Sequence, residues 1–236
     1  MSQKIPRRTF LALAGSLAAP KLSPGEVDPP VVLDHILLGC NDLDGGIAFV
    51  EKRTGVRAIF GGVHPGRGTR NALLSLGERH YLEIIAPDPQ QGGAPVMRNL
   101  RKLAEPRLVG WAAHPGDVTQ FAAQLRDSGI EFEGPTPGSR KRPDGRLLKW
   151  KTLNLKNDEQ GVLPFFIEWS VGTVHPSADA PSGCKIERFT MSGPNEVELR
   201  GRCALLNLEV HVEHSEKLQL YARIFGLNGH TMELKS

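Results

Sequence analysis

Two short stretches of the chain place a single carboxylate inside an otherwise apolar run. Glu83 lies in YLEII, residues 81–85, and Glu168 lies in FIEWS, residues 166–170. Both stretches have the composition of buried strands, in which an ionised carboxylate is costly to desolvate unless it is paired. Each carboxylate is therefore expected to face a countercharge or a polar cavity.

A histidine stands in a comparable position on an earlier predicted strand. VLDHILLGC, residues 32–40, reads as a strand whose alternation gives His35 a defined face. If that face and those of Glu83 and Glu168 line one cavity, the three side chains can hold a divalent ion such as Fe, Mn, Ni or Zn. One carboxylate could leave the ion and act as a general base, so Glu83 and Glu168 are also candidate catalytic residues. The alternatives are carboxylates that pair with Lys, Arg or backbone donors, and a hydrogen-bonded core histidine.

A second candidate site is the glycine-rich stretch GGVHPGRGTRN, residues 61–71. Its glycines let backbone approach a ligand closely, and its arginines can hold a carboxylate or phosphate through paired N–H donors. Two tryptophans elsewhere could wall an apolar pocket. The candidate substrate-binding residues are His64, Arg67, Thr69, Arg70, Asn71, Trp111 and Trp150. The alternatives are a hairpin turn with solvated charges and tryptophans that belong to the core.

The elements that position these residues occur twice. From residue 31 the pattern runs strand, helix and three strands, and it then repeats with the helix ends RTGVRAIF and DSGIEFEG in matching places. We predict a first βαβββ unit at 31–92 and a second at 93–172. The second unit contains a longer basic segment, SRKRPDGR at 139–146, which reads as a solvated loop.

The remaining residues, 173–236, predict a partial third βα unit. LNLEVHV at 206–212 alternates like a strand, and SEKLQLYARIFGLNG at 215–229 reads as an amphipathic helix. Only HTMELKS remains after it, which leaves room for one short strand.

The first 30 residues have the features of an export signal. KIPRR precedes the short apolar run TFLALAGSLAA, and a proline-rich linker follows. Arg7 and Arg8 resemble a twin-arginine signal. We therefore expect export by the twin-arginine translocase, a periplasmic location and no stable membrane anchor after cleavage. No apolar run reaches the ~20 residues of a membrane span.

Composition narrows the range of partners. The chain has 29 Lys and Arg against 26 Asp and Glu, and its first 20 residues contribute the three-charge excess through Lys4, Arg7 and Arg8. A mature chain without them has no net field to attract nucleic acid. Three cysteines without CxxC spacing form neither a zinc framework nor a complete disulfide set. A small-molecule ligand is the expected partner, and a homodimer is left open.

The stretches DHILLGCNDLD, GGVHPGRGTRNALLSLG, YLEIIAPDP and HPSADAPSGC together resemble the glyoxalase-like domain proteins of the vicinal oxygen chelate superfamily. The resemblance implies an α+β fold in which paired βαβββ units form a half-open barrel, here followed by the partial third βα unit. It also implies a cavity with metal ligands on the first and fourth strands of each unit. This chain fills three of those four positions, because the fourth corresponds to Val109.

The resemblance leaves two kinds of function open. One is a metal-dependent enzyme that acts as an isomerase, lyase or dioxygenase on a small oxygen-rich molecule, such as a carbonyl compound, a hydroxy acid or a diol. The other is a metal-free protein that binds or sequesters such a molecule on the same scaffold.

Overall fold

The computed structural model describes residues 29–91, 99–156, 158 and 161–236. The predicted export signal at 1–30 therefore lies almost wholly outside the described residues. Within these ranges, no helix is both long enough and apolar enough to cross a membrane.

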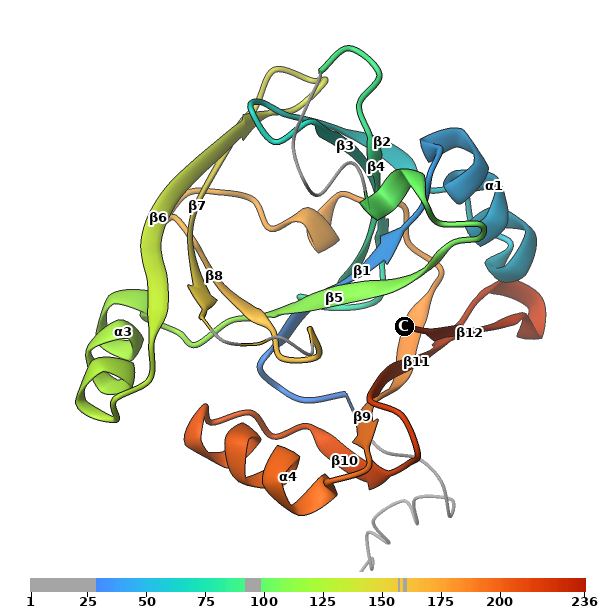
Figure 1. Ribbon diagram of the computed structural model, residues 1–236. Helices are drawn as coiled ribbons and strands as arrows, with labels where there is room; N and C mark the ends of the chain where they lie inside the picture. The colour runs from blue at the N-terminus through green and yellow to red at the C-terminus, as the bar shows by residue number, and fades with distance from the viewer. Residues whose placement is uncertain (1–28, 92–98, 157, 159–160) are drawn as a thin grey trace, which may run out of the picture.

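Two βαβββ units follow one another along the chain, which confirms the predicted α+β fold (Figure 1). The first unit consists of β1 (Leu33–Gly39), α1 (Leu43–Thr54), β2 (Ile59–His64), β3 (Thr69–Ser75) and β4 (Tyr81–Pro87). The second unit consists of β5 (Arg107–Ala113), α3 (Val118–Asp127), β6 (Phe132–Lys141), β7 (Leu147–Leu155) and β8 (Phe165–Trp169).

Local capping fixes where each helix starts. The Asp42 side chain accepts a hydrogen bond from the Gly45 amide at the start of α1, and Asp117 caps α3 in the same way. Gly55 ends α1 in the left-handed region, with φ of 74°, which a residue without Cβ adopts at little cost. These caps place the connecting turns and therefore the register of the strands that follow.

The strands of both units form one curled sheet in the order β2-β3-β4-β1-β5-β8-β7-β6. The first strands of the two units, β1 and β5, pair antiparallel at its centre. The curl brings the edge strands β2 and β6 into contact, so the sheet surrounds a central space (Figure 1). Helices α1 and α3 pack on its outer surface, which leaves the inner face available for a site.

The C-terminal part differs from the prediction. It has the full order β9 (Lys185–Gly193), α4 (Glu196–Leu205), β10 (His211–His214), β11 (Gln219–Phe225) and β12 (Thr231–Lys235). The helix predicted at 215–229 is wrong, because β11 occupies this region. Leu220, Ala222 and Ile224 are buried in strict alternation, and pairing with β9 and β12 outweighs the helical spacing of the apolar residues. The strand order β10-β9-β11-β12 also differs from that of the first two units.

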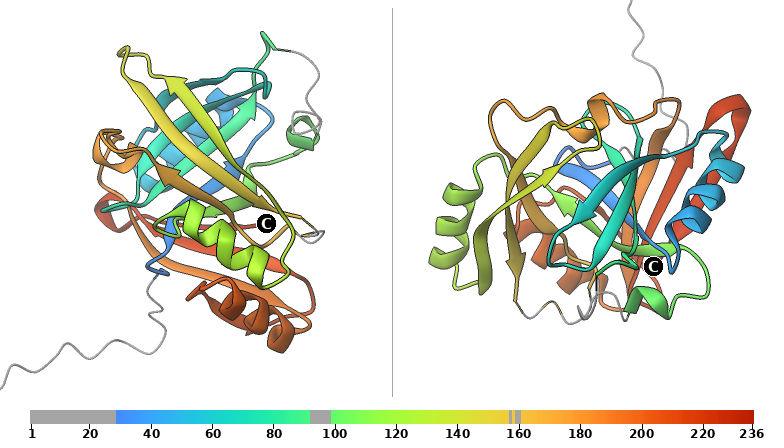
Figure 2. Two further views of the ribbon diagram at one scale, coloured as in Figure 1. Left: turned by 90° about the vertical axis from the view of Figure 1, so that its left-hand side faces the viewer. Right: turned by 90° about the horizontal axis from the view of Figure 1, so that it is seen from above.

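The C-terminal unit packs against the outside of the curled sheet (Figure 2). Strands β11 and β12 contact β5, and β12 also contacts α1. Trp111 of β5 lies 5.0 Å from Phe189 of β9 between ring centroids, and both side chains are fully buried. The three units therefore share one hydrophobic core.

This shared core predicts that Phe189→Ala destabilises the whole chain. Truncation of a buried Phe to Ala costs about 3–5 kcal/mol, and urea denaturation followed by circular dichroism should show that loss in a single transition. Phe225→Ala is the matched control, because Phe225 is 45% exposed and its truncation should have little effect. A loss below about 1 kcal/mol for Phe189→Ala, or a separate early transition, would contradict a common core.

Candidate functional site

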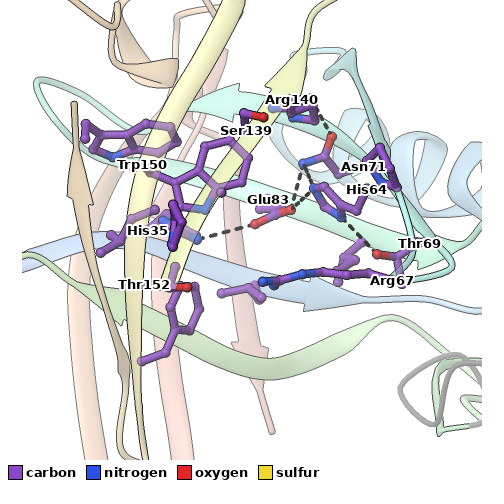
Figure 3. A pocket seen from close by; sticks show the side chains of 18 of the residues that line it. His35, His64, Arg67, Thr69, Asn71, Glu83, Ser139, Arg140, Trp150 and Thr152 are labelled. Carbon is purple, nitrogen blue, oxygen red and sulfur yellow. Dashed lines mark hydrogen bonds and ion pairs between the residues drawn. The ribbon is translucent and has the colours of Figure 1, made fainter. Parts of the chain in front are cut away.

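The inner face of the curled sheet encloses a cavity of about 790 Å³. Polar side chains from β1, β2, β3 and β4 and from the β2–β3 turn form one wall, and aromatic side chains from β7 and β8 lie opposite them (Figure 3). This division into a polar and an aromatic wall is typical of a small-molecule site. The cavity is lined by His35, Leu37, His64, Pro65, Gly66, Arg67, Thr69, Asn71, Tyr81, Glu83, Ile85, Pro137, Gly138, Ser139, Arg140, Trp150, Thr152, Phe165, Ile167 and Trp169.

Glu83 lies at the centre of the polar wall. The Asn71 amide donates to its Oε1 at 2.7 Å, and His35 Nε2 lies 3.3 Å from its Oε2. His64 Nε2 approaches Oε1 from the other side at 3.6 Å, so two imidazoles flank one carboxylate (Figure 3). Burial alone would raise the pKa of Glu83, but the His35 imidazole 3.3 Å away, the His64 imidazole and the Asn71 amide lower it to about 2.

His35 is held from behind by the preceding residue. Its Nδ1 lies 2.6 Å from Oδ1 of Asp34, and Oδ2 of Asp34 accepts from Trp169 Nε1 at 3.0 Å. His175, in the linker before β9, also contacts this oxygen through Nε2 at 3.2 Å. Burial would lower the pKa of His35, but the hydrogen bond with Asp34 and the negative charges of Asp34 and Glu83 raise it to about 9.

The surroundings of His64 favour its neutral form, whereas those of His35 favour the protonated form. Its Nδ1 lies 2.9 Å from Thr69 Oγ1, and its Nε2 lies 3.3 Å from the Asn71 amide nitrogen. An amide nitrogen only donates, so Nε2 is the acceptor and the ring is neutral in this arrangement. Burial, more than any other influence, lowers the pKa of His64. The cavity therefore contains two histidines whose environments displace their pKa values in opposite directions.

Arg140 of β6 completes the polar wall and is a residue that the sequence interpretation missed. It donates to Asn71 Oδ1 at 3.1 Å across the contact between β6 and β2. The segment 139–146 was predicted to be a solvated loop, which is wrong for residues 139–141, because β6 extends through Lys141 and buries the Arg140 side chain. Nothing in the local pattern distinguishes Arg140 from the basic residues that follow it.

Three predicted site residues lie outside the cavity, which corrects the sequence interpretation. Glu168 faces α3, where its Oε2 accepts from the Val118 amide at 2.8 Å and Oε1 lies 3.8 Å from Lys151 Nζ. The reason is strand phase: Phe165, Ile167 and Trp169 of β8 point into the cavity, so Glu168 points away from it. The backbone-donor and lysine partners considered as the alternative for Glu168 are those observed.

Strand phase explains the other two residues as well. Arg70 points away from the cavity between Thr69 and Asn71, and its guanidinium lies 3.8 Å from Asp42. Trp111 is buried in the core, where its Nε1 donates to the Val162 carbonyl at 2.7 Å. The remaining predicted residues, His35, His64, Arg67, Thr69, Asn71, Glu83 and Trp150, all line the cavity.

The predicted three-ligand metal set of His35, Glu83 and Glu168 does not fit this geometry. Glu168 lies outside the cavity, and Val109 at the fourth position is exposed. Across the described ranges, no group of three or more His, Cys, Asp and Glu side chains is placed to hold an ion. The pair of His35 and Glu83 still has the chemistry of metal ligands. His35 Nε2 is buried without a hydrogen-bond partner among the described residues and faces Glu83.

Comparison with known proteins places this geometry in context. The glyoxalase-like domain family matches residues 33–206. A hypothetical protein from Staphylococcus aureus shares the fold, with 17% identity over 86% of this chain and 84% of that chain and a TM-score of 0.59. No protein of curated function matches the chain.

Two epimerase structures are also similar. Methylmalonyl-CoA epimerase from Streptomyces coelicolor, in complex with 2-nitronate-propionyl-CoA, is 25% identical over 62% of this chain and 99% of that chain, with a TM-score of 0.46. Methylmalonyl-CoA epimerase from Mycobacterium tuberculosis is 22% identical over 60% of this chain and 89% of that chain, also with a TM-score of 0.46.

The raised pKa of His35 predicts how stability depends on pH. A group whose pKa rises on folding, here from 6.5 to about 9, stabilises the fold fully below pH 6.5 and loses that contribution as pH approaches 9. Chelator-treated protein should therefore lose on the order of 3 kcal/mol of unfolding free energy between pH 6.5 and 9, because each tenfold difference in proton affinity corresponds to ~1.4 kcal/mol. Urea denaturation at several pH values measures this. His35→Gln should remove the slope, and an equal slope in both proteins would show that another group causes it.

Proposed function

The chain belongs to the glyoxalase-like domain family of the vicinal oxygen chelate superfamily, and we propose that its cavity binds a small oxygen-rich molecule and transfers a proton on it. The observation that carries this proposal is the placement of two imidazole nitrogens, from His35 and His64, on either side of the buried Glu83 carboxylate. Such a pair can act on a C–H bond next to a carbonyl group. Whether the reaction is that of an isomerase or of a lyase depends on the next step of the resulting enol.

His64 is the base in this proposal. Its neutral Nε2 takes the proton from carbon, and the electron pair of the broken C–H bond moves into the bond to the carbonyl carbon. To act as a base, His64 Nε2 gives up the long 3.3 Å hydrogen bond from the Asn71 amide. The Asn71 amide nitrogen, which only donates, sets the tautomer that leaves Nε2 as an acceptor, and the Thr69 hydroxyl then accepts from the opposite nitrogen.

His35 is the acid. Its protonated Nε2 donates to the oxygen that gains charge, which stabilises the enolate and can deliver a proton to give the enol. Asp34 fixes the orientation of the ring and supports its positive charge. Glu83 keeps both imidazoles in place and balances the cation at the centre of the site. Divergent pKa values within one site are a recurrent sign of acid and base roles.

A metal-dependent reaction is the second candidate, and one observation favours it. His35 contacts a carboxylate through Nδ1, and its Nε2 has no hydrogen-bond partner among the described residues. Metal-bound histidines usually have such a partner on the ring nitrogen that does not hold the metal. His35 and Glu83 would hold the divalent ion, which would supply a Lewis acid for the substrate oxygen. Among the described residues, the second unit directs no His, Cys, Asp or Glu side chain into the cavity, so substrate or water would complete the coordination.

The proposed proton transfer predicts hydrogen–deuterium exchange at carbon. Wild-type protein in D₂O, incubated with a panel of 2-oxo acids, hydroxyketones and β-dicarbonyl compounds, should label a C–H position of its substrate by NMR. His64→Gln and Glu83→Gln should each slow labelling about 100-fold or more. Glu168→Gln is the matched control and should match wild type, because Glu168 faces α3.

Metal analysis in the same experiment separates the candidates. Labelling that persists after chelation, in protein without stoichiometric metal, supports transfer by the two histidines alone. Labelling that is lost with chelator and restored by one of Fe, Mn, Ni or Zn supports the metal-dependent candidate. Ligand binding without any labelling would overturn both and leave a sequestering protein.

We also propose that the protein is exported through the twin-arginine translocase and acts in the periplasm. Support comes from Arg7 and Arg8 before the short apolar run at 9–19. Lysine at both positions should retain the protein in the cytoplasmic fraction of a bacterial host with that translocase, whereas wild type is recovered in the periplasm. Equal periplasmic recovery of both proteins would contradict this route.

A further inference from the structure

Arg140 is a buried cation that has no acidic partner among the described residues. Only 5% of the residue is exposed, and the ion pairs of the described residues include none with Arg140. Its neighbour two residues on, Arg142, is paired with both Asp144 and Asp179. Buried charges are almost always paired, so a guanidinium at the wall of a cavity that no described carboxylate contacts directly needs a separate explanation.

The fold makes dedicated room for this guanidinium. A Cβ on Gly61 or Gly62 of β2 would lie 2.9 or 2.8 Å from an Arg140 terminal nitrogen, closer than packed atoms allow. The glycine pair therefore opens a slot between the two edge strands through which Arg140 reaches Asn71. This contact is the single side-chain hydrogen bond that Arg140 makes to a described residue, although a guanidinium carries five N–H donors. The side chain lines the cavity, so the other donors are available to a ligand.

The charges around the cavity do not balance. Among the described residues that line the cavity, one carboxylate, Glu83, stands against the two guanidinium groups of Arg67 and Arg140, while Asp34 lies behind His35 and outside the lining. The two guanidinium groups therefore exceed the carboxylate by one positive charge, before either histidine is counted. Burial lowers the pKa of Arg140, but arginine stays protonated in proteins, so the excess charge persists.

The aromatic wall of the cavity indicates the shape and polarity of the rest of the ligand. Trp150, Phe165 and Trp169 present aromatic surface to the cavity, and the Trp150 and Trp169 rings lie 5.6 Å apart at an interplanar angle of 60°. Flat apolar groups pack well against such surfaces. A ligand that fits both walls has an oxyanion at one end and a flat apolar body at the other.

We propose that Arg140 is the subsite for an oxyanion of the ligand, a carboxylate or a phosphate, whose flat apolar body packs on Trp150 and Trp169. Arg67 at the mouth of the cavity adds a second positive charge. The proposal rests on the proposed function in so far as the same cavity is the reaction site, and it names the class of molecule to be turned over. It places the anionic end beside Asn71, next to the two histidines.

Fluorescence of the cavity tryptophans provides a binding test that needs no turnover. The probes are phenylacetate, phenyl phosphate and the uncharged 2-phenylethanol, titrated into chelator-treated protein. At least one anion should bind ten times or more tightly than the alcohol, and the preferred anion identifies the oxyanion as carboxylate or phosphate. Arg140→Gln should remove this preference, Arg140→Lys should retain part of it, and binding of the alcohol should be unchanged. Arg146→Gln is the matched control, because Arg146 is exposed and pairs with Asp144 outside the cavity.

Equal binding of the anions and the alcohol by wild type would overturn the proposal, and this comparison remains valid if Arg140→Gln does not fold. Undiminished anion preference in a folded Arg140→Gln protein would overturn it as well. The outcome is separable from that of the proposed function. Anion preference without deuterium labelling would reject the reaction and keep the subsite, whereas labelling without anion preference would reject the subsite alone.

Discussion

The buried carboxylate of Glu83 is the constraint on which the site depends. Desolvation of an ionised carboxylate costs several kcal/mol, so its partners must be held in place by the fold. They come from separate elements: His35 from β1, His64 from the end of β2 and Asn71 from β3. Arg140 on β6 then holds Asn71 from across the contact between the edge strands. The interactions that keep Glu83 charged therefore also stabilise the curl of the sheet.

Much of the architecture could be predicted from the sequence because its signals are local. Helix caps, glycine-rich turns and the offset between the two units depend on short stretches, and they identify the paired βαβββ fold. The alternation that puts His35 on a face with Leu37 is equally local, and both residues line the cavity. YLEII and FIEWS look alike for the same reason, yet their carboxylates meet different partners. Which side chains of a strand face inward depends on what packs against its outer side. For β8 this is α3, and the position of α3 over β8 is set by tertiary contacts and not by the local sequence.

The features that could not be predicted depend on contacts between distant segments. Arg140 is buried because two edge strands meet, and Trp169 reaches Asp34 across 135 residues of sequence. His175 contacts the same carboxylate from the linker to the C-terminal unit. The strand β11 has apolar residues at spacings that also suit a helix, and its partners β9 and β12 determine the outcome. In each case the deciding interaction is absent from the local pattern.

The unequal use of the two units has an evolutionary consequence. In the first unit, replacement of any of the residues around Glu83 disturbs a charged network, so this half of the barrel can change little. In the second unit, Trp150, Thr152 and Ile167 line the cavity, and they make none of the hydrogen bonds or ion pairs described for its polar wall. Substitution there can alter the shape of the bound molecule while the chemistry stays intact. A duplicated fold of this kind can diversify in specificity through such positions of its second copy, while the first copy, together with Arg140 and Trp169 of the second, keeps the charged network.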